Sequence, residues 1–327
     1  MVDQSPPHSI KDHRTAPSDL LKPPMVGILL CTYNGETYLK GQIESFIAQS
    51  YEHWQLFVSD DGSTDGTGKI LQDYQALLGE NMFVFNGPKE GFAQNFMSLI
   101  RNKTINCDYY AFSDQDDIWL PDKLERSLAA LANNEQNAPS LYCSRTQHID
   151  SEGNLTSVSP SFIKPPSFSN ALVQSLAGAN TMLINESARK LLARTDLQAT
   201  VIAHDWLAYL IVSGCGGLIV FDQEPTLLYR QHGANIIGAN TGIQNRIRRV
   251  RDMLGGMSKY WNEKNLLILR EYTSELTPHN RLLLGYFEQL RKSNLWTRLF
   301  LVKKARLYRQ TLAGTISLYV AVALNQL

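Results

Sequence analysis

The chain has 327 residues, of which 43% are hydrophobic, and its 31 Lys and Arg balance its 31 Asp and Glu. The length suits one large α/β domain with an appendage, and the apolar content supports a sizeable core. Cys31, Cys107, Cys143 and Cys215 lack the spacing of a zinc site, so we expect reduced thiols in a cytoplasmic protein.

Residues 1–24 combine five prolines with polar residues, and no apolar segment typical of a secretory signal follows the start. Such a composition cannot bury enough apolar surface to order the chain. We therefore predict a flexible arm at 1–24 and assign it no structure.

Apolar runs alternate with helical patterns over the next hundred residues. The runs at 25–32, 55–59, 82–85 and 109–112 predict strands, and the patterns that follow them, ending near residues 49, 74, 100 and 131, predict helices. Strands that alternate with helices form a mostly parallel sheet with short loops at one edge. The polar motifs after the first, second and fourth strands should therefore converge, and this edge is where open α/β sheets bind ligands.

Two polar motifs follow the first two predicted strands. They are Thr32-Tyr33-Asn34-Gly35-Glu36 and, at 60–66, Asp-Asp-Gly-Ser-Thr-Asp-Gly. The second resembles a calcium-binding loop, but Gln72 stands where that loop needs a bidentate Glu, and a strand rather than a helix leads into it. We interpret it as a Gly-rich turn with Asp65 as the N-cap of a helix. The functional hypothesis is that Asp60 or Asp61 accepts hydrogen bonds from a nucleoside.

Three carboxylates stand within four residues after the fourth predicted strand, in the motif Asp114-Gln115-Asp116-Asp117. Clustered carboxylates repel one another unless a positive charge joins them. A hard divalent cation, which takes oxygen ligands and bridges to phosphates, is the expected partner. The alternative is a solvated acidic turn that caps the following helix.

The middle of the chain gives weaker signals. Residues 141–144 predict a strand, and residues 145–158 predict a polar hairpin. The small residues near Gly178 and Asn180 fit either contact with a ligand or tight packing. Asp205 lies at the start of an apolar helical pattern. An acid at this position can have a purely structural role, as a favourable charge at the positive end of the helix dipole.

The balanced net charge hides an asymmetry. From residue 241 to the end there are 15 Lys and Arg against 5 Asp and Glu, so the first 240 residues carry 16 against 26. The basic residues cluster at 246–251 and 291–309, and apolar side chains alternate with the second cluster at near-helical spacing. This pattern predicts either a basic amphipathic helix on an anionic membrane or a packed helix with a solvated basic face. Residues 310–327 are uncharged but at the short limit for a membrane span, and no motif indicates nucleic acid binding.

Six motifs of the chain resemble the signatures of family 2 glycosyltransferases with the GT-A fold. In chain order they lie at 32–36, 60–65, 113–119, 121–124, 204–206 and 229–233. They cover residues 25–240 in the family's order, and the forms at 114–117 and 229–233 are most similar to the bacterial rhamnosyltransferase-type subgroup. The resemblance implies a Rossmann-like α/β catalytic domain at 25–240 with a mostly parallel central sheet. The charge and apolar spacing described above predict a helical, basic extension at 241–327, either associated with the membrane or packed on the catalytic domain.

The same resemblance implies roles for particular residues. Asp205 would be the catalytic base, and Mg²⁺ or Mn²⁺ would bind Asp116, assisted by Asp114 or Asp117. The nucleotide would contact Thr32, Tyr33, Asn34, Glu36, Asp60, Asp61 and Asp114. Candidate contacts to the diphosphate or the acceptor are Lys89, Asn95, Trp119, Gly178, Asn180, Arg230 and His232.

The implied reaction is an inverting transfer of a sugar, with rhamnose as a candidate, from a dTDP- or UDP-linked donor to a hydroxyl of a glycan or polyprenyl-linked acceptor. It would serve bacterial surface polysaccharide synthesis in the cytoplasm, on the inner face of the plasma membrane, without nucleic acid. Two other classes stay open. A sugar nucleotidyltransferase should carry a basic Gly-rich loop after the first strand, but no Lys or Arg occurs there before Lys40. A non-catalytic nucleotide-sugar or membrane-surface binding protein would not need Asp205.

Overall fold

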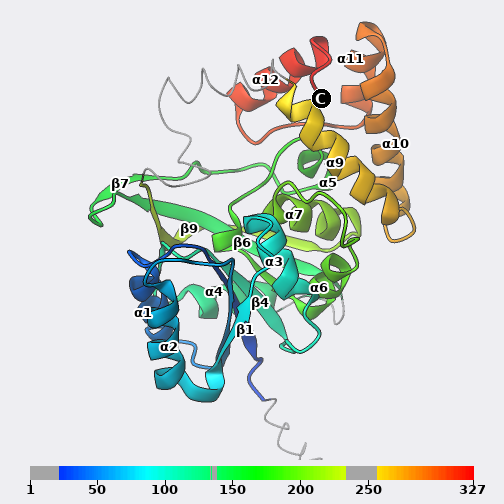
Figure 1. Cartoon of the computed structure of the whole chain (residues 1–327). Coiled ribbons are helices and arrows are strands. Elements are labelled where there is room, and N and C mark those ends of the chain that lie inside the picture. Colours follow the sequence, from blue (N-terminus) through cyan, green and yellow to red (C-terminus); the bar gives the residue numbers. More distant parts are fainter. Residues whose placement is uncertain (1–21, 133, 135–137, 233–255) are drawn as a thin grey trace, which may run out of the picture.

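The computed structural model describes residues 22–132, 134, 138–232 and 256–327. It is an α/β structure built on one nine-stranded sheet with the order β3-β2-β1-β4-β8-β6-β9-β5, and β7 pairs with β6 beside this path. Helices cover both faces of the sheet, and the C-terminal helices gather at one end of the molecule (Figure 1). The predicted arm, as far as residue 21, and the basic cluster at 246–251 lie outside the described residues.

The first half of the sheet is parallel, as the sequence predicts. β1 (Val26–Thr32) lies between β2 (Trp54–Asp60) and β4 (Tyr109–Ser113), and β3 (Met82–Asn86) pairs with β2. The connecting helices are α1 (Leu39–Ile47), α2 (Thr67–Leu78) and α3 (Phe92–Arg101). Every residue of β1 is buried, because α1 and α2 contribute to the core on one face of the sheet and α3 to the core on the other. A strand covered on both faces reads as an unbroken apolar run, which is why the sequence reveals it.

The second half of the sheet is mixed, so the prediction of a mostly parallel sheet holds only for the first four strands. β8 (Leu183–Asn185) pairs antiparallel with β4, and β6 (Ser140–Ile149) pairs antiparallel with β8. β9 (Leu218–Arg230) runs parallel to β6, and β5 (Ile118–Trp119) is antiparallel to β9. The predicted hairpin is confirmed as β6 and β7 (Leu155–Val158), although β6 continues beyond the expected end at residue 144.

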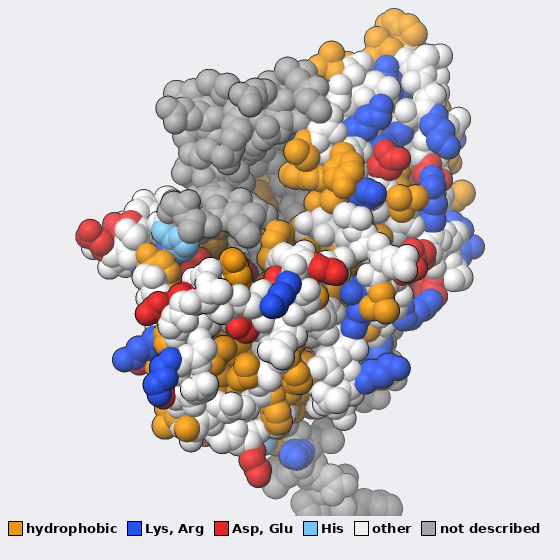
Figure 2. Space-filling view, in the orientation of Figure 1, with side chains coloured by type: hydrophobic (Ala, Val, Ile, Leu, Met, Phe, Trp, Pro, Cys, Tyr) orange, Lys and Arg blue, Asp and Glu red, His pale blue; other side chains and the backbone are white. Residues whose placement is uncertain are grey.

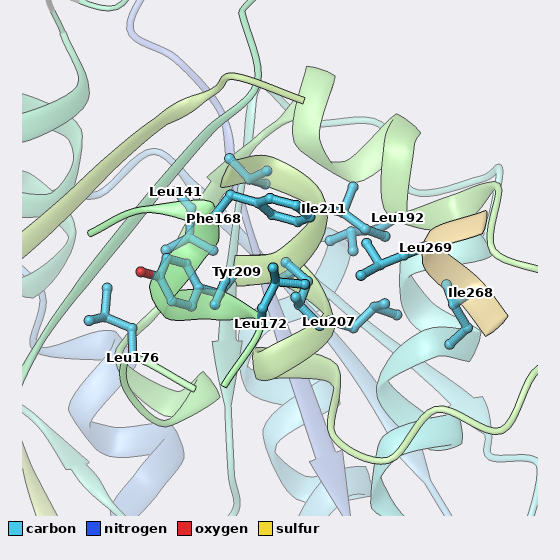
Figure 3. Close-up of a cluster of buried hydrophobic side chains, with 14 of the residues drawn as sticks. Leu141, Phe168, Leu172, Leu176, Leu192, Leu207, Tyr209, Ile211, Ile268 and Leu269 are labelled. Atoms are coloured by element: carbon cyan, nitrogen blue, oxygen red, sulfur yellow. The ribbon is translucent and has the colours of Figure 1, made fainter. Parts of the chain in front are cut away.

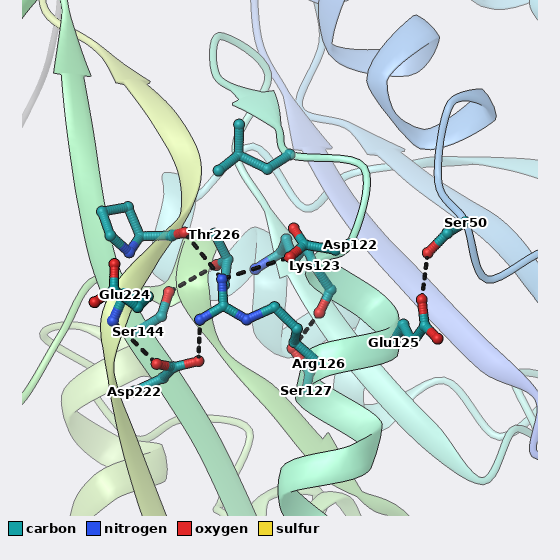
Figure 4. A network of polar contacts seen from close by, with 12 residues as sticks. Ser50, Asp122, Lys123, Glu125, Arg126, Ser127, Ser144, Asp222, Glu224 and Thr226 are labelled. Atoms are coloured by element: carbon teal, nitrogen blue, oxygen red, sulfur yellow. Dashed lines mark hydrogen bonds and ion pairs between the residues drawn. The ribbon is translucent and has the colours of Figure 1, made fainter.

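The 13-residue strand β9 has no counterpart among the predicted elements. Its centre reads Asp222-Gln223-Glu224-Pro225, which interrupts the apolar pattern, and Pro cannot donate a hydrogen bond to a neighbouring strand. A shift of register against β6 after Ser144 accommodates these residues. Arg126 on α4 (Lys123–Leu131) donates to Asp222 at 2.7 Å and ties the strand to this helix (Figure 4). The last residue of the strand, Arg230, contacts the acidic loop that follows β4, where its Nε donates to Asp116 O.

The predicted C-terminal helical extension is confirmed for the residues described there. It consists of α9 (Met257–Glu271), α10 (Pro278–Lys292), α11 (Leu295–Lys304) and α12 (Leu312–Ala323). Ile268 and Leu269 on α9 enter the same hydrophobic core as Leu207 and Ile211 on α7 (His204–Gly214) (Figure 3). The core also takes side chains from α5 (Phe168–Ala171) and α6 (Glu186–Ala193). Among the described residues, no helix combines the length and the apolarity that crossing a bilayer requires.

Candidate functional site

The loops after β1 and β2 are held together by hydrogen bonds between their polar side chains. Asn34 N donates to Ser63 Oγ at 2.8 Å, and Asn34 Oδ1 accepts from Thr64 N at 2.8 Å. Asn34 has a positive φ of 50°, a backbone conformation that Asn adopts more readily than most residues. Glu36 accepts from Gly66 N at 2.9 Å. Asn34 and Glu36, both predicted to contact a nucleotide, therefore shape the loop that would receive it.

The helix after the second loop begins later than the sequence predicts. Gly66, not Asp65, is the N-cap of α2, and no side chain caps this helix. Asp65 still accepts hydrogen bonds, from Thr67 N at 3.0 Å and from Glu36 N at 3.1 Å. Its carboxylate therefore binds the first residue of α2 and ties the start of this helix to the loop after β1.

Gln115 clamps the acidic loop to the end of β1. Its Oε1 accepts from Thr32 Oγ1 at 2.6 Å and from Tyr33 N at 2.8 Å, while its Nε2 donates to Tyr33 O at 3.2 Å. A Cβ atom on Gly35 would lie 2.5 Å from Gln115 Oε1, so only glycine fits beside this clamp. Sequence reasoning did not select Gln115, although a neutral amide among three acids is a signal that could have drawn attention to it.

The two acids at the end of β2 face different partners. Asp60 accepts from Ser63 N within its own turn at 3.2 Å. Asp61 reaches the segment after β3, where it accepts from Lys89 N at 2.6 Å and from Gly91 N at 3.3 Å. Asp61 therefore fixes the loop that carries Lys89 against the edge of the sheet.

Asn95 lies beneath this loop on α3. Its side chain is buried, and its Nδ2 donates to Ser59 O at 3.1 Å. Its Oδ1 has no hydrogen-bond partner among the described residues. A Cβ atom on Gly87 would lie 2.7 Å from this oxygen, so the backbone passes close above it. Asn95 therefore has a structural role, because its buried side chain packs beneath the loop at Gly87 and binds the end of β2.

Asp117 is enclosed by protein donors. Its side chain is 1% exposed, its Oδ2 accepts from Asn180 Nδ2 at 2.6 Å, and its Oδ1 accepts from Arg230 N at 3.2 Å. Lys123 Nζ donates to Asn180 O at 3.0 Å and completes a buried polar chain. Because both oxygens of Asp117 already accept, this placement favours a supporting role for it over direct binding of a cation.

Asp116 meets the end of β9. His232 Nε2 lies 2.7 Å from Asp116 Oδ2, and Arg230 Nε donates to Asp116 O at 3.1 Å. The rings of Tyr38 and His232 are 5.0 Å apart, and the Arg230 guanidinium lies 4.7 Å from the centre of the Tyr38 ring. Two candidate contacts that are over a hundred residues from Asp116 in sequence are thus brought to it.

Asp205 lies at the N-terminal end of α7, and its Oδ1 accepts from Trp206 N at 2.6 Å. The surrounding protein raises the pKa of Asp205 to about 6, chiefly because burial disfavours the charged form. Burial raises the pKa of Asp114 to about 7, and the negative charges of Asp116 and Asp205 raise it further. His204, the first residue of α7, packs edge-on against Phe112 of β4, so the N-terminal end of α7 lies beside the start of the acidic loop.

Trp119 and Gly178, two of the candidate contacts to the diphosphate or the acceptor, make contacts within the protein that are typical of structural residues. The Trp119 side chain is 2% exposed and packs edge-on against Phe46. Gly178 contributes its carbonyl, which accepts from Thr181 N at 3.1 Å and from Thr181 Oγ1 at 2.8 Å. Neither placement points to a direct contact with a ligand.

The acidic loop can be tested for its fit to a divalent cation. Within the described residues, no three or more His, Cys, Asp or Glu side chains are arranged to enclose a metal ion. Cations at phosphate sites commonly use one or two carboxylates together with substrate phosphates, without a full protein cage. The Asp116 carboxylate, with the His232 imidazole beside it, fits a cation shared with a bound diphosphate.

Comparison with known proteins identifies relatives of this chain. The family model described as glycosyl transferase family 2 matches residues 27–191. The chain is 29% identical over 273 residues to the dTDP-rhamnosyl transferase RfbG of Shigella flexneri. This alignment covers 80% of this chain and 90% of that protein.

Solved structures share the fold at low identity. Residues 1–349 of S. aureus TarS, in complex with UDP-GlcNAc, give a TM-score of 0.54 at 13% identity, over 91% of this chain and 90% of that chain. GalNAc-T7 with UDP, GalNAc and Mn²⁺ gives a TM-score of 0.51 at 13% identity, over 90% of this chain and 58% of that chain. The expected GT-A fold is thereby confirmed.

Proposed function

The chain belongs to glycosyl transferase family 2, and from this membership we propose that it transfers a sugar from a nucleotide diphosphate donor to an acceptor hydroxyl with inversion at the anomeric carbon. One observation carries the proposal. The acidic loop at 114–117, the end of β9 and the N-terminus of α7 meet at the carboxyl edge of the parallel strands. This edge is where α/β sheets bind ligands.

The donor is proposed from the site and from the relatives together. The loops around Asn34 and Asp61 form the nucleotide side of the site, with the exposed ring of Tyr33 beside them. We propose a dTDP- or UDP-sugar, with dTDP-rhamnose as the first candidate because RfbG is a dTDP-rhamnosyl transferase. The TarS structure contains UDP-GlcNAc, which supports a nucleotide-sugar donor of this general kind.

Asp116 would hold Mg²⁺ or Mn²⁺ together with the donor diphosphate, and His232 would lie beside it. When bound, the cation supplies positive charge that offsets the negative charge gained by the leaving diphosphate. Arg230 and Asn180 fix the orientation of Asp117 and so keep the acidic loop in position. The solved structure of GalNAc-T7 with Mn²⁺ supports this part of the proposal.

Asp205 would act as the general base. Its raised pKa allows it to take the proton of the acceptor hydroxyl and still be ionised near neutral pH. Attack by that hydroxyl on the face opposite the leaving group inverts the anomeric centre in one displacement, without a covalent intermediate. Oxocarbenium character develops on the sugar during this step.

We propose a glycan or polyprenyl-linked acceptor, in bacterial surface polysaccharide synthesis. The enzyme would work in the cytoplasm, as a peripheral protein on the inner face of the plasma membrane. Support comes from the excess of basic residues after residue 240, where 15 Lys and Arg stand against 5 Asp and Glu. Anionic lipid headgroups attract such segments.

A donor panel tests the transfer reaction directly. The full chain is incubated with UDP-, dTDP- and GDP-sugars in the presence of Mn²⁺, and release of the nucleoside diphosphate is followed over time. We expect slow hydrolysis of one donor class, with tighter binding of the matching free nucleotide. If no donor is bound or hydrolysed, the proposed activity is wrong.

Replacing Asp61 with Ala should weaken the binding of free UDP or dTDP. A hydrogen bond to a charged group is worth about 1.5–3 kcal/mol, and the loop anchored through Lys89 N and Gly91 N is released as well. Titration calorimetry measures the loss. The control is Asp73→Ala, because Asp73 pairs with Lys69 on the exposed surface of α2. An unchanged dissociation constant would exclude Asp61 and turn attention to Asp60.

The pH dependence of kcat/KM should report the ionisation of Asp205. Because its carboxylate is the active form and its pKa is raised to about 6, kcat/KM should rise tenfold per pH unit below that pKa and level off above it. A bound cation nearby would shift the midpoint downward. The folded-state pKa also exceeds the unfolded value, so this group lowers stability as pH rises through about 6. A flat profile between pH 4.5 and 7 would contradict the assignment.

A further inference from the structure

Helix α12 is apolar on both its buried and its exposed side. Its twelve residues include no charged side chain, and Leu318, Ala321 and Val322 are buried. The outward side is equally apolar, with exposed fractions of 78% for Leu312, 58% for Ile316, 43% for Val320 and 50% for Leu324. These four residues are spaced by four, so they form one stripe along the helix. A surface helix of a globular protein normally places polar residues there.

Helix α11 carries a second exposed stripe. Trp296 is 79% exposed and Phe300 is 61% exposed, four residues apart, and Lys303 and Lys304 follow one turn later. The buried side of the same helix holds Leu301, Val302 and Arg298, and Arg298 donates to Val322 O of α12 at 2.8 Å. The prediction of a packed helix is therefore correct for one side of α11. Its other side presents aromatic and basic groups together.

The segment that carries both stripes is basic. Residues 291–327 contain seven Lys and Arg and neither Asp nor Glu. Arg291, Arg298 and Arg309 donate to backbone carbonyls, whereas the exposed cations are Lys292, Lys303, Lys304 and Arg306. Figure 2 shows basic and apolar side chains over the C-terminal helices, together with a few acidic ones.

We infer that the two stripes form one membrane-docking surface, here called the α11–α12 surface and made of Trp296, Phe300, Lys303, Lys304, Leu312, Ile316, Val320 and Leu324. Helix α12 lies in the plane of an anionic bilayer, with its aliphatic stripe among the acyl chains. A twelve-residue helix is about 18 Å long, too short to cross a hydrocarbon core of about 30 Å. Aromatic residues suit the interface, and lysines attract anionic headgroups.

The charge pattern favours a bilayer over a second copy of the chain. Two copies that met through this surface would bring Lys303 and Lys304 of each copy together, and residues 291–327 contain no acidic residue to pair with them. Anionic lipid supplies the opposite charge. The inference gives the proposed peripheral location a defined surface, and it does not depend on the transfer reaction.

Vesicle flotation tests the α11–α12 surface with the full chain. Vesicles of phosphatidylcholine with phosphatidylglycerol are compared with phosphatidylcholine alone. The double variant Ile316→Ser with Val320→Ser should lower the partition coefficient at least about tenfold, because two aliphatic side chains no longer enter the lipid. Leu77→Ser is the matched control, since Leu77 is 69% exposed on α2.

The charge contribution is measured separately. Lys303→Gln with Lys304→Gln should weaken binding to anionic vesicles by roughly fivefold per lysine and leave binding to neutral vesicles unchanged. Lys40→Gln with Lys69→Gln, on α1 and α2, provides the control. Added salt should reduce anionic binding of the parent chain for the same reason.

Several outcomes would overturn the inference. One is undiminished vesicle binding by the Ser double variant, and another is equal binding to neutral and anionic vesicles. A third is a lipid-free dimer that the Ser substitutions convert to a monomer in light scattering. If the double variant unfolds early, the single variant Leu312→Ser decides, because Leu312 is 78% exposed. Hydrolysis of the sugar donor should stay unchanged in all of these variants, so failure of the transfer reaction would be recognised independently.

Discussion

Replacing Asp116 with Asn is expected to reduce turnover nearly to background. A neutral amide is a poorer ligand for a hard cation than a carboxylate. The Asp116 carboxylate lies 2.7 Å from His232 Nε2, and the backbone carbonyl of Asp116 is held by Arg230 Nε. Donor binding should lose its dependence on Mg²⁺ or Mn²⁺ at the same time. The measurement is the initial rate of nucleoside diphosphate release across a Mn²⁺ titration.

Asp73→Asn is the matched control for this experiment. Asp73 lies on the exposed surface of α2, outside the motifs, and pairs with Lys69 at 2.6 Å. It should keep close to full activity, because a surface ion pair of this kind contributes little. Full activity of the parent chain in excess EDTA would show that the reaction does not need a divalent cation.

Replacing Asp205 with Asn should lower kcat by about a hundredfold to ten-thousandfold, the range that general-base assistance provides. The amide keeps the size of the side chain and can still accept from Trp206 N, so donor affinity should stay nearly constant. A fall in kcat without a change in donor binding marks an interaction that is used only in the transition state. The control is Asp196→Asn, an exposed acid that precedes the same helix.

The stereochemical outcome provides an independent check on the same step. Proton NMR of the product should show the anomeric configuration opposite to that of the donor, and retention would contradict a single displacement. A fully active Asp205→Asn variant would move the base elsewhere, with Asp114 as the next candidate, because both oxygens of Asp117 already accept hydrogen bonds. Donor binding without any turnover in the parent chain would favour a non-catalytic binding protein.

The parts of the fold that sequence reasoning predicted are those with a simple burial pattern. β1 is covered on both faces and therefore reads as a continuous apolar run. β9 is covered unevenly and contains Pro225, so its pattern resembles that of a loop. β5 has only two residues, too few to show any period. The mixed order of the second half of the sheet follows from such elements, and it could not be predicted without them.

In the candidate site, too, some features could be predicted from the sequence and others could not. The motifs themselves mark the loops at the edge of the sheet, because acids, Gly and Asn gather where strands end. The pairings between distant residues do not appear in any local pattern. Asn180 meets Asp117 across 63 residues of sequence, and His232 meets Asp116 across 116. The burial of Trp119 was also missed, because an aromatic residue beside an acidic motif reads equally as a ligand contact or as core.

The hydrophobic core that α7 shares with α9 limits how a chain of this kind can change during evolution. Ile268 and Leu269 pack with Leu207 and Ile211 in one cluster, and Asp205, the proposed base, lies on the same helix α7. Exchange of the C-terminal helices with those of a relative would replace one side of this packing and leave the other unmatched, at a cost in stability. Substitutions on the outward stripes of α11 and α12 meet no such constraint. The proposed α11–α12 surface can therefore change residue by residue, whereas the helices that carry it are bound by packing to the helix of the proposed base.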